Sequence, residues 1–366
     1  MRRRSAPRAR RVAGLLTLAG LVIACAPPGR PATGPPTAAI SPTATSVSPT
    51  VKAAPLWTLA VAGDIHFAGR TLPLLDDPAT AIGPIAARFR AADLAVANLE
   101  TAVTDGGTPE PKTFLFRAPA TALDAFRAGG LDAAVLANNH ALDYGRDGLA
   151  DTLAAAAERQ YPVVGVGPDA DAAYAPYIAT VRGTRVAILA LSQIRELSSR
   201  WAAGPGRSGL ASGLDVARSV AAVRAARAAA DVVVVYVHWG REGQECPTAA
   251  QRELAAAVAT AGADAIVSTH AHLLLGDGWL GRTFVSYGLG NFVWWRDHAY
   301  SNDTGVLTLT FTGRTVTRAA FTPAVISPTG QPLVAEGAEA ERIRTRYAAL
   351  RECTGLAGGP GRPRGG

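Results

Sequence analysis

The chain has 366 residues, of which 48% are hydrophobic and 18% are charged, and this composition excludes a mainly disordered chain and a coiled coil. No apolar run reaches the ~18 residues that a membrane span needs. The net charge of +7 arises at the N-terminus, where the first 24 residues hold six arginines and no acid, so that 30 basic and 29 acidic side chains remain elsewhere. The charge therefore gives no support for binding nucleic acid, and we expect none.

Residues 1–25 have the pattern of a lipoprotein-type signal peptide. An arginine-rich segment precedes an apolar stretch at 12–24 that is too short to cross a bilayer unaided. The stretch ends in Val22-Ile23-Ala24-Cys25, which resembles a bacterial lipoprotein box. We expect an exported protein, anchored by lipid on Cys25 to the outer face of the cytoplasmic membrane or elsewhere in the cell envelope. The alternatives are plain cleavage and a retained anchor.

Two further segments are predicted to be flexible, and two cysteines are predicted to pair. Residues 26–55 form a linker rich in Pro, Thr, Ser and Ala, and residues 353–366 form a tail rich in Gly, Pro and Arg. Cys246 and Cys353 remain as an even pair, which favours a disulfide in an oxidising compartment, with two separate thiols as the alternative. On the chain-entropy argument, a disulfide closing this loop contributes ~4–5 kcal/mol.

Residues 56–352 are predicted to form one α/β domain, because apolar runs typical of strands alternate with alanine-rich helical patterns. Strands are expected at 57–63, 94–97, 132–137, 163–166, 185–191, 231–237, 265–268, 283–287, 305–311 and 316–321. Helices are expected at 79–92, 119–128, 146–159, 214–230, 248–262 and 335–351. The expected fold is a sandwich of mixed β-sheets flanked by helices.

Five of these strands end directly in polar side chains, and five of the six histidines lie in these clusters. The clusters are Gly63-Asp64-Ile65-His66, Asn98-Leu99-Glu100, Asn138-Asn139-His140, His238-Trp239-Gly240 and Thr269-His270-Ala271-His272. Ligands of open α/β sheets gather at the carboxyl ends of strands, so the five clusters are expected to share one crevice. One such histidine alone is more often structural, but five together indicate a site.

The residue types in these clusters indicate a metal centre. Asp64 with His66, and His270 with His272, are two residues apart, so each pair should project from one face of an extended segment. A set of carboxylate, amide and imidazole ligands suits Mn, Fe or Zn, and it differs from the thiolate ligands of a structural zinc site. A set of this size favours two divalent ions that share a carboxylate, and such a pair can activate water to hydroxide and clamp a phosphoryl group.

In their order along the chain, these motifs resemble those of the calcineurin-like metallophosphoesterase fold. The run from Gly63-Asp64 to the segment Tyr287-Gly288-Leu289-Gly290-Asn291-Phe292 resembles more closely the bacterial capsule synthesis family called CapA or PGA_cap. That resemblance covers most of the folded domain. It implies a role in the synthesis or export of poly-γ-glutamate or another capsule polymer, with other capsule-synthesis proteins as potential partners.

The resemblance also implies roles for individual residues. It places Asp64, His66, Glu100 and His272 around one ion, and Glu100, Asn139, His238 and His270 around the other, with His140 as the general acid. The chain departs from the phosphoesterase pattern at two positions. Asn98-Leu99-Glu100 stands where those enzymes have Gly-Asp, and Thr269 stands where they have Gly.

Substrate binding is predicted for Asn98, Lys112 and Arg117, since the two cations could hold a carboxylate or a phosphate. The favoured activity is metal-dependent hydrolysis of a phosphoester. The alternatives are a protein that binds an anionic surface polymer without turnover, and a hydrolase of γ-glutamyl amides. Trp239, Trp294 and Trp295 are expected to pack in the core, with an apolar rim around the site as the alternative.

Overall fold

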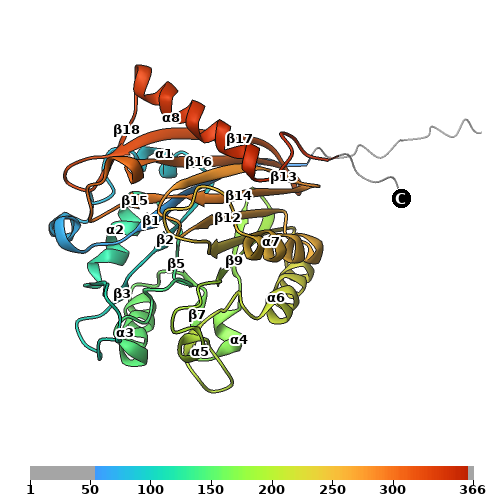
Figure 1. Cartoon of the computed structure of the whole chain (residues 1–366). Helices are drawn as coiled ribbons and strands as arrows, with labels where there is room; N and C mark the ends of the chain where they lie inside the picture. Colours follow the sequence, from blue (N-terminus) through green and yellow to red (C-terminus); the bar gives the residue numbers. More distant parts are fainter. Residues whose placement is uncertain (1–53, 362–366) are drawn as a thin grey trace, which may run out of the picture. The chain divides into compact units, whose positions relative to one another are not determined.

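The computed structural model describes residues 54–361. The predicted signal sequence with Cys25, nearly all of the predicted linker, and residues 362–366 lie outside the described residues. Within the described range the chain forms two large mixed sheets with helices around them (Figure 1). Both sheets contain parallel and antiparallel pairs, and the α/β sandwich expected from the sequence is therefore confirmed.

The first sheet has eight strands, with β1 near its centre. In spatial order they are β18 (Pro332–Val334), β17 (Thr315–Ile326), β16 (Asp303–Thr312), β1 (Leu56–Ile65), β2 (Leu94–Leu99), β5 (Ala133–Val135) and β6 (Val163–Val164), with β15 (Asn291–Val293) beside the end of β1. The strands β1, β2, β5 and β6 run parallel. Their carboxyl ends therefore meet at one edge, where polar side chains follow them.

The second sheet has six strands. Their order is β13 (Leu274–Leu280), β14 (Thr283–Leu289), β12 (Ala265–Thr269), β11 (Val232–His238), β9 (Thr184–Ser192) and β8 (Tyr177–Val181). Two short ribbons complete the strands, β3 (Ala102–Val103) with β4 (Arg117–Ala118) and β7 (Val166–Gly167) with β10 (Gly209–Leu210). The pairs β9–β11, β11–β12 and β12–β14 are parallel, so this sheet also presents a row of carboxyl ends.

The two sheets pack face to face, and strand periodicity explains how. Trp57, Leu59 and Val61 of β1 lie in the same buried cluster as Val232 and Val234 of β11, which is the layer between the sheets. The alternate residues of each strand face the helices instead. Both faces of β11 are consequently buried, which accounts for its unbroken apolar sequence.

Helices cover the outer face of each sheet (Figure 1). The helices α1 (Ala86–Arg90), α2 (Thr121–Gly129) and α3 (Gly145–Glu158) contribute to the core on the outer face of the first sheet, while α6 (Val216–Ala229) and α7 (Ala249–Ala261) cover the second. The helix α8 (Gly337–Ala349) packs on β13 and β17. The remaining helices are short: α4 (Ala170–Ala173), α5 (Ser198–Trp201), η1 (Gly69–Asp76), η2 (Ala299–Ser301) and η3 (Leu350–Cys353).

Several elements differ from the sequence expectation for local reasons. The helix expected at 79–92 is reduced to the five residues of α1, because Gly83 with a φ of 77° and Pro84 precede it. The strand expected at 163–166 is split into β6 and β7 at Gly165, whose φ is 89°. The strands β8 and β13 were not expected.

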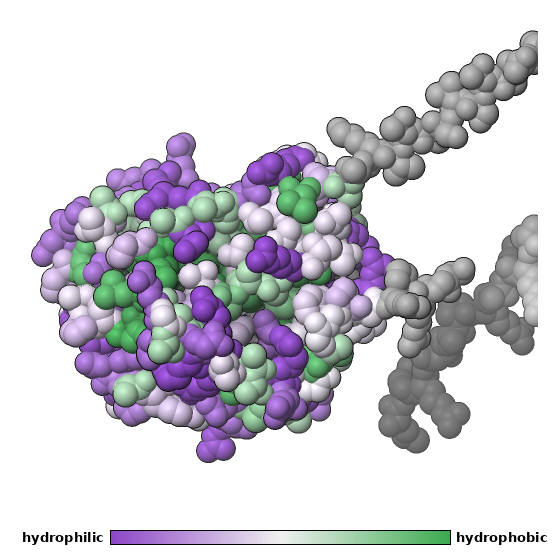
Figure 2. All heavy atoms as spheres, turned by 90° about the horizontal axis from the view of Figure 1, so that it is seen from above, coloured by the Kyte–Doolittle hydropathy of each residue, from purple (hydrophilic) through white to green (hydrophobic). Residues whose placement is uncertain are grey.

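The outer surface mixes polar and apolar residues. Hydrophilic residues are spread over the face shown in Figure 2, with apolar areas between them. Among the described residues, the large apolar side chains that are exposed come from separate elements and include Leu72, Phe114, Ile178 and Tyr300. No helix in residues 54–361 combines the length and the hydropathy that crossing a bilayer requires.

Candidate metal centre

Strand register brings the polar clusters of the sequence to the same level. In the first sheet, Asp64 of β1 pairs with Asn98 of β2 on one side and with Asn291 of β15 on the other. In the second sheet, His238 of β11 pairs with Thr269 of β12. The carboxyl ends of both sheets thus deliver their side chains to one crevice, as the sequence pattern predicted.

A glycine makes the close approach of β15 possible. A Cβ atom at Gly63 would lie 1.9 Å from the carbonyl oxygen of Gly290, so only glycine fits there. The next residue, Asp64, donates its backbone N–H to that same carbonyl at 2.9 Å. This contact fixes the backbone of Asp64 next to the segment that carries Asn291.

Three groups of side chains among the described residues could each hold a metal ion. In each group, one potential ligand atom per residue lies within 4.8 Å of the others. The groups are Asp64, Glu100 and His272; Glu100, His238 and His270; and Glu242, His270 and His272. Glu100, His270 and His272 each belong to two of them, and Glu100 is the residue shared by the groups that contain Asp64 and His238. We call the floor of the site the residues Asp64, Glu100, Asn139, His238, His270 and His272.

The surroundings of Glu100 indicate whether the floor fits a cation. Its side chain is fully buried, and neither carboxylate oxygen has a hydrogen-bond partner. Burial raises the pKa of this carboxyl well above its ordinary value, and the nearby Asp64 carboxylate raises it further. A buried carboxylate without donors is unfavourable unless it binds a cation or takes up a proton. The floor therefore fits divalent cations held by oxygen and nitrogen ligands.

The second sheet supplies closely packed imidazoles. His238 Nε2 lies 3.0 Å from His270 Nδ1, 2.7 Å from Asn139 Oδ1 and 3.2 Å from Glu100 Oε1. Burial lowers the pKa of His238 to about 4, so its ring is neutral at physiological pH. Neutral imidazole nitrogens that converge on a carboxylate are the form in which histidine binds metals.

His270 and His272 lie on strained backbone. Their φ angles are 94° and 57°, a region that residues other than glycine rarely adopt. The backbone N–H of His270 is held by Asp64 Oδ2 at 3.2 Å. Such strain persists where the surrounding structure imposes it, and it is concentrated at functional sites.

His272 differs from the other histidines of the floor because it lies beside carboxylates. Its Nδ1 is 2.9 Å from Asn291 Oδ1 and 3.4 Å from Asp64 Oδ2, and its Nε2 is 3.9 Å from Glu242. Burial opposes the charged ring, but Asp64 and Glu100 outweigh it and raise the pKa to about 9. Before a metal binds, His272 therefore carries the positive charge that balances Asp64.

The proposed general acid, His140, is held by a residue that the sequence analysis missed. His140 Nδ1 lies 2.6 Å from Asp143 Oδ2, and Asp143 Oδ1 accepts a hydrogen bond from Lys112 Nζ at 2.8 Å. Burial raises the pKa of Asp143 to about 7, against the lowering effect of Lys112. The backbone N–H of Phe116 also donates to Asp143 Oδ2, at 2.6 Å. This arrangement engages Nδ1 of His140 and leaves Nε2 for the pocket. The spacing His-x-x-Asp was the available sequence signal.

Three residues predicted to bind substrate lie in other surroundings. Asn98 is fully buried, and its amide donates to Asp64 Oδ1 at 2.8 Å, so it orients a ligand. The side chain of Lys112 is 4% exposed and its ammonium contacts Asp143 and the carbonyl oxygen of Asn139, so it is not free for an anion. Arg117 stacks on Tyr144 at 4.8 Å and does not line the pocket.

His66, predicted as a ligand, belongs to none of the three groups of potential metal ligands. Its Nε2 accepts a hydrogen bond from the backbone N–H of Trp295 at 3.1 Å, and its ring stacks on Trp294 at 4.3 Å. Its Nδ1 has no hydrogen-bond partner. Burial lowers the pKa of His66 well below its ordinary value, and the charges of His272 and Asp64 still act on it.

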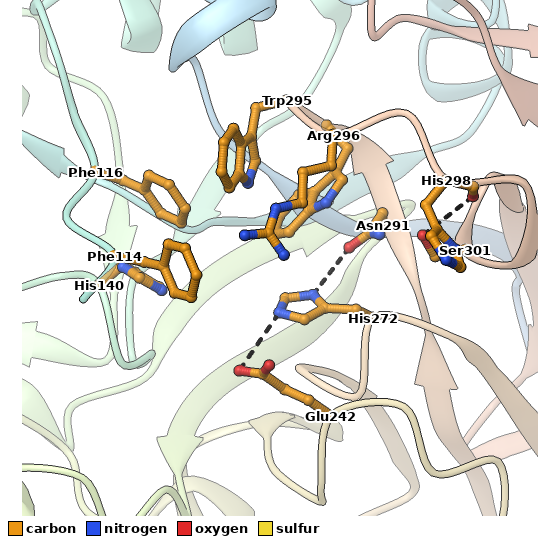
Figure 3. Close-up of a pocket in the computed structure, with 11 residues that line it drawn as sticks. Phe114, Phe116, His140, Glu242, His272, Asn291, Trp295, Arg296, His298 and Ser301 are labelled. Atoms are coloured by element: carbon orange, nitrogen blue, oxygen red, sulfur yellow. Dashed lines mark hydrogen bonds and ion pairs between the residues drawn. The ribbon is translucent and has the colours of Figure 1, made fainter. Parts of the chain in front are cut away.

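A pocket of about 160 Å³ opens above the floor (Figure 3). His140, Glu242, His272 and Asn291 line its inner part. We call its rim the residues Phe114, Phe116, Trp294, Trp295 and Arg296, which also line it. Of the three tryptophans expected in the core, Trp239 and Trp294 are buried, but Trp295 is partly exposed. Trp294 and Trp295 line the pocket, as in the alternative of an apolar rim. Glu242 and the other rim residues lie on loops without periodicity, and no sequence signal singled them out.

The two cysteines of the described region form a disulfide. Cys246 follows β11 in the loop that carries Glu242, and Cys353 lies in η3 after α8. Beyond the disulfide, the segment predicted as a flexible tail contacts β13: Trp279 and Ala357 exchange two backbone hydrogen bonds, at 2.9 and 3.0 Å. The C-terminal segment is thereby attached to the second sheet and to the loop beside the site.

The family match and two relatives of this chain agree with each other. Residues 58–294 match the family described as bacterial capsule synthesis protein PGA_cap. The PGA biosynthesis protein CapA of Bacillus subtilis is 37% identical over 158 residues, which are 43% of this chain and 41% of that protein. The capsule biosynthesis protein CapA of Bacillus anthracis is 33% identical over 176 residues, or 46% and 41% of the two chains. The matched segments thus span about two fifths of these relatives.

Solved structures are similar only at a general level. A putative 5'-nucleotidase from Staphylococcus aureus is 15% identical, with a TM-score of 0.48 over 81% of this chain and 58% of that chain. A similarity of this size says nothing about substrate or activity. The family match covers the second sheet, the strands β1, β2, β5, β6 and β15 of the first sheet, and all the floor residues, from Asp64 to His272. The chain therefore belongs to the bacterial capsule synthesis protein PGA_cap family.

Proposed function

We propose that this protein is a metal-dependent hydrolase of the cell envelope that acts in the synthesis of a capsule or polyglutamate polymer. The observation that carries the proposal is Glu100, a fully buried carboxylate without hydrogen-bond donors, shared by two groups of potential metal ligands. The family and the relatives named for PGA and capsule biosynthesis support the biological setting.

The proposed centre holds two divalent ions of Mn, Fe or Zn. Asp64, Glu100 and His272 would bind one ion, and Glu100, His238 and His270, with Asn139, would bind the other. When bound, such ions supply Lewis acidity toward a phosphoryl or carbonyl oxygen and activate water. Glu242 is close enough to His270 and His272 to complete the set from the open side.

The residues around the floor would orient the reacting groups. Asn98 fixes the carboxylate of Asp64, and Asn291 fixes the ring of His272. Burial lowers the pKa of His140 well below its ordinary value, so the ring needs Asp143 at Nδ1 to stabilise its protonated form. In that form Nε2 would donate a proton to the leaving oxygen or nitrogen in the pocket. Phe116, whose ring lies 4.3 Å from that of His140, limits the access of water to this proton. The substrate would be a phosphoester or, as the second candidate, a γ-glutamyl amide.

We further propose that the protein is exported and anchored by lipid on Cys25. The N-terminal pattern supports export, and the Cys246–Cys353 disulfide supports it independently, because disulfides persist in oxidising compartments. Labelling of cells with radioactive palmitate would test the anchor: the wild-type protein should incorporate label, and Cys25→Ser should not.

The proposed activity is tested by metal analysis and by turnover of the purified full-length protein. We expect about two bound divalent ions per chain, and hydrolysis of phosphoester or γ-glutamyl substrates that chelators abolish. The variant His140→Ala should retain its metal but lose activity by ~10²–10⁴-fold, since it removes the proton donor and no metal ligand.

The same variant separates hydrolysis from binding without turnover. If His140→Ala leaves both hydrolysis and the amount of capsule polymer on cells unchanged, the hydrolase proposal is wrong. Arg224→Gln is the matched control, because Arg224 is exposed on α6 and belongs to neither the floor nor the rim. It should behave as the wild type in both measurements.

A further inference from the structure

The rim of the pocket carries a cation enclosed by aromatic rings. The guanidinium of Arg296 lies 4.7 Å from the centre of the Phe114 ring and 4.5 Å from that of Trp295. Figure 3 shows it directed into the pocket, on the same side as His272. Stacking on two rings orients the planar group and leaves the N–H groups at its edge available.

The charge of Arg296 is not neutralised within the described part of the chain. Its guanidinium has no hydrogen bond to, and forms no ion pair with, any residue in 54–361, and the adjacent Asp297 pairs with Arg70 at 3.7 Å. Glu242, the acid that lines the pocket, lies beside His272, with its carboxylate 3.9 Å from His272 Nε2. Arg296 is therefore available to an anion that enters from solvent.

The backbone that carries Arg296 is held in place. Arg70 donates to the carbonyl oxygens of Arg296 at 2.6 Å and of Trp294 at 3.1 Å. The N–H of Trp294 also bonds to the carbonyl oxygen of Gly330 at 3.0 Å. A cation whose backbone and side-chain plane are both fixed loses little entropy when it binds an anion, as a recognition site requires.

We propose that Arg296, with Phe114 and Trp295, forms a subsite for a carboxylate of a γ-linked glutamate chain whose reacting group lies at the floor. This inference rests on the proposed function, since it names the substrate class of that site. The Arg296 fork matches a carboxylate in bidentate geometry. The aliphatic part of a γ-linked residue can lie along the aromatic rim. The guanidinium already stacks on both rings, so a flat heterocyclic base has no free slot between them.

Binding of a short γ-linked glutamate oligomer to the purified full-length protein tests the subsite. Trp294 and Trp295 line the pocket, so tryptophan fluorescence should report binding. Arg296→Gln should weaken binding about tenfold or more, the size of effect expected when a charged bidentate contact is lost. Arg296→Lys should bind the oligomer with an intermediate affinity. The distant control Arg224→Gln should bind it with the affinity of the wild type. The uncharged analogue, in which each free α-carboxylate of the oligomer is replaced by its amide, should not bind measurably.

Two outcomes would overturn the subsite. One is wild-type affinity of Arg296→Gln for the glutamate oligomer, with circular dichroism and thermal unfolding unchanged. The other is a loss in Arg296→Gln that affects inorganic phosphate as strongly as the oligomer, because the cation would then serve the phosphate. Turnover is measured in parallel: binding that depends on Arg296 without any hydrolysis would refute the hydrolase proposal and retain the subsite, whereas hydrolysis with binding that ignores Arg296 would do the reverse.

Discussion

The floor and the rim of the pocket are built on different kinds of backbone. The floor residues follow strands of two sheets, and all six have at most 6% exposure except His272, whose side chain is 19% exposed. The rim residues come from loops, and Phe114 is 43% exposed. Strand ends fix ligand positions well, which metal binding requires, while loops allow the entrance to be shaped for a particular substrate.

The two regions also differ in charge. The floor concentrates buried acids and imidazoles, whereas the rim presents one free guanidinium among aromatic rings. In the proposed function, chemistry and recognition are therefore assigned to separate residues. Changes to the floor should affect metal content and turnover, and changes to the rim should affect the affinity for substrate.

The largest effect should follow from Glu100→Gln. The change removes the carboxylate that two ligand groups share, so metal affinity should fall by more than the ~10–100-fold that loss of a ligand-orienting residue costs. Turnover should fall to background. Metal content by atomic emission spectroscopy and hydrolysis assays check both.

The same variant should be at least as stable as the wild type when both are metal-free. Glu100 has a raised pKa in the folded state, so the metal-free wild type loses stability as pH rises from the ordinary Glu pKa toward the folded value. Glutamine has no such dependence. A metal-free Glu100→Gln protein with a clearly lower Tm than the wild type at pH 7 would show that the carboxylate is structural.

A smaller effect is expected from Asp143→Asn. One carboxylate oxygen accepts from His140 and from the N–H of Phe116, and the other accepts from Lys112. An amide must place its NH₂ group against one of these donors, so kcat should fall by ~10²-fold or more while metal content is unchanged. The double variant with His140→Ala should be no slower than His140→Ala alone. Additive losses would contradict a role through His140.

The contrast between floor and rim also explains what the sequence could predict. Strand periodicity located Asp64, Glu100, Asn139 and His238, because polar residues directly after buried strands must lie at the carboxyl edge. His66, predicted from the same pattern, belongs to none of the three groups; it follows β1, and its ring stacks on Trp294. His270 and His272 share a ligand group although their backbone is strained, not extended.

Strand periodicity could not predict which loop residues meet at the pocket. Arg296 and Phe114 meet only because Arg70, more than 200 positions away from Arg296, holds its loop. Lys112 was expected to face the substrate because it is a cation near the site, but the sequence contains no signal that a buried acid, Asp143, would engage it. Spacing along the chain predicts contacts within an element, and not those between loops.

The smallest effect should come from the ion pairs that join α8 to the start of β16 and to the loop that carries Glu242. Asp303 accepts hydrogen bonds from Arg342 at 2.5 and 2.9 Å and from Arg346 at 2.7 Å, and Arg346 also pairs with Glu245 beside the disulfide. Burial would raise the pKa of Asp303, but the two arginines outweigh it and lower the pKa. Asp303→Asn should lower the free energy of unfolding by about 2 kcal/mol at pH 7 and leave metal content at the wild-type level.

The lowered pKa of Asp303 determines how the difference in Tm between the wild type and Asp303→Asn changes with pH. Because the folded pKa of Asp303 is depressed, its stabilisation is present above the ordinary Asp pKa of about 4 and is lost as pH falls from there through the folded value. The difference in Tm between the wild type and Asp303→Asn should therefore be full at pH 7 and shrink in that acid range. A difference that stays constant down to pH 3 would mean that shape, and not charge, joins α8 to the start of β16. In that case α8 would be held by packing and geometry, as the floor residues are.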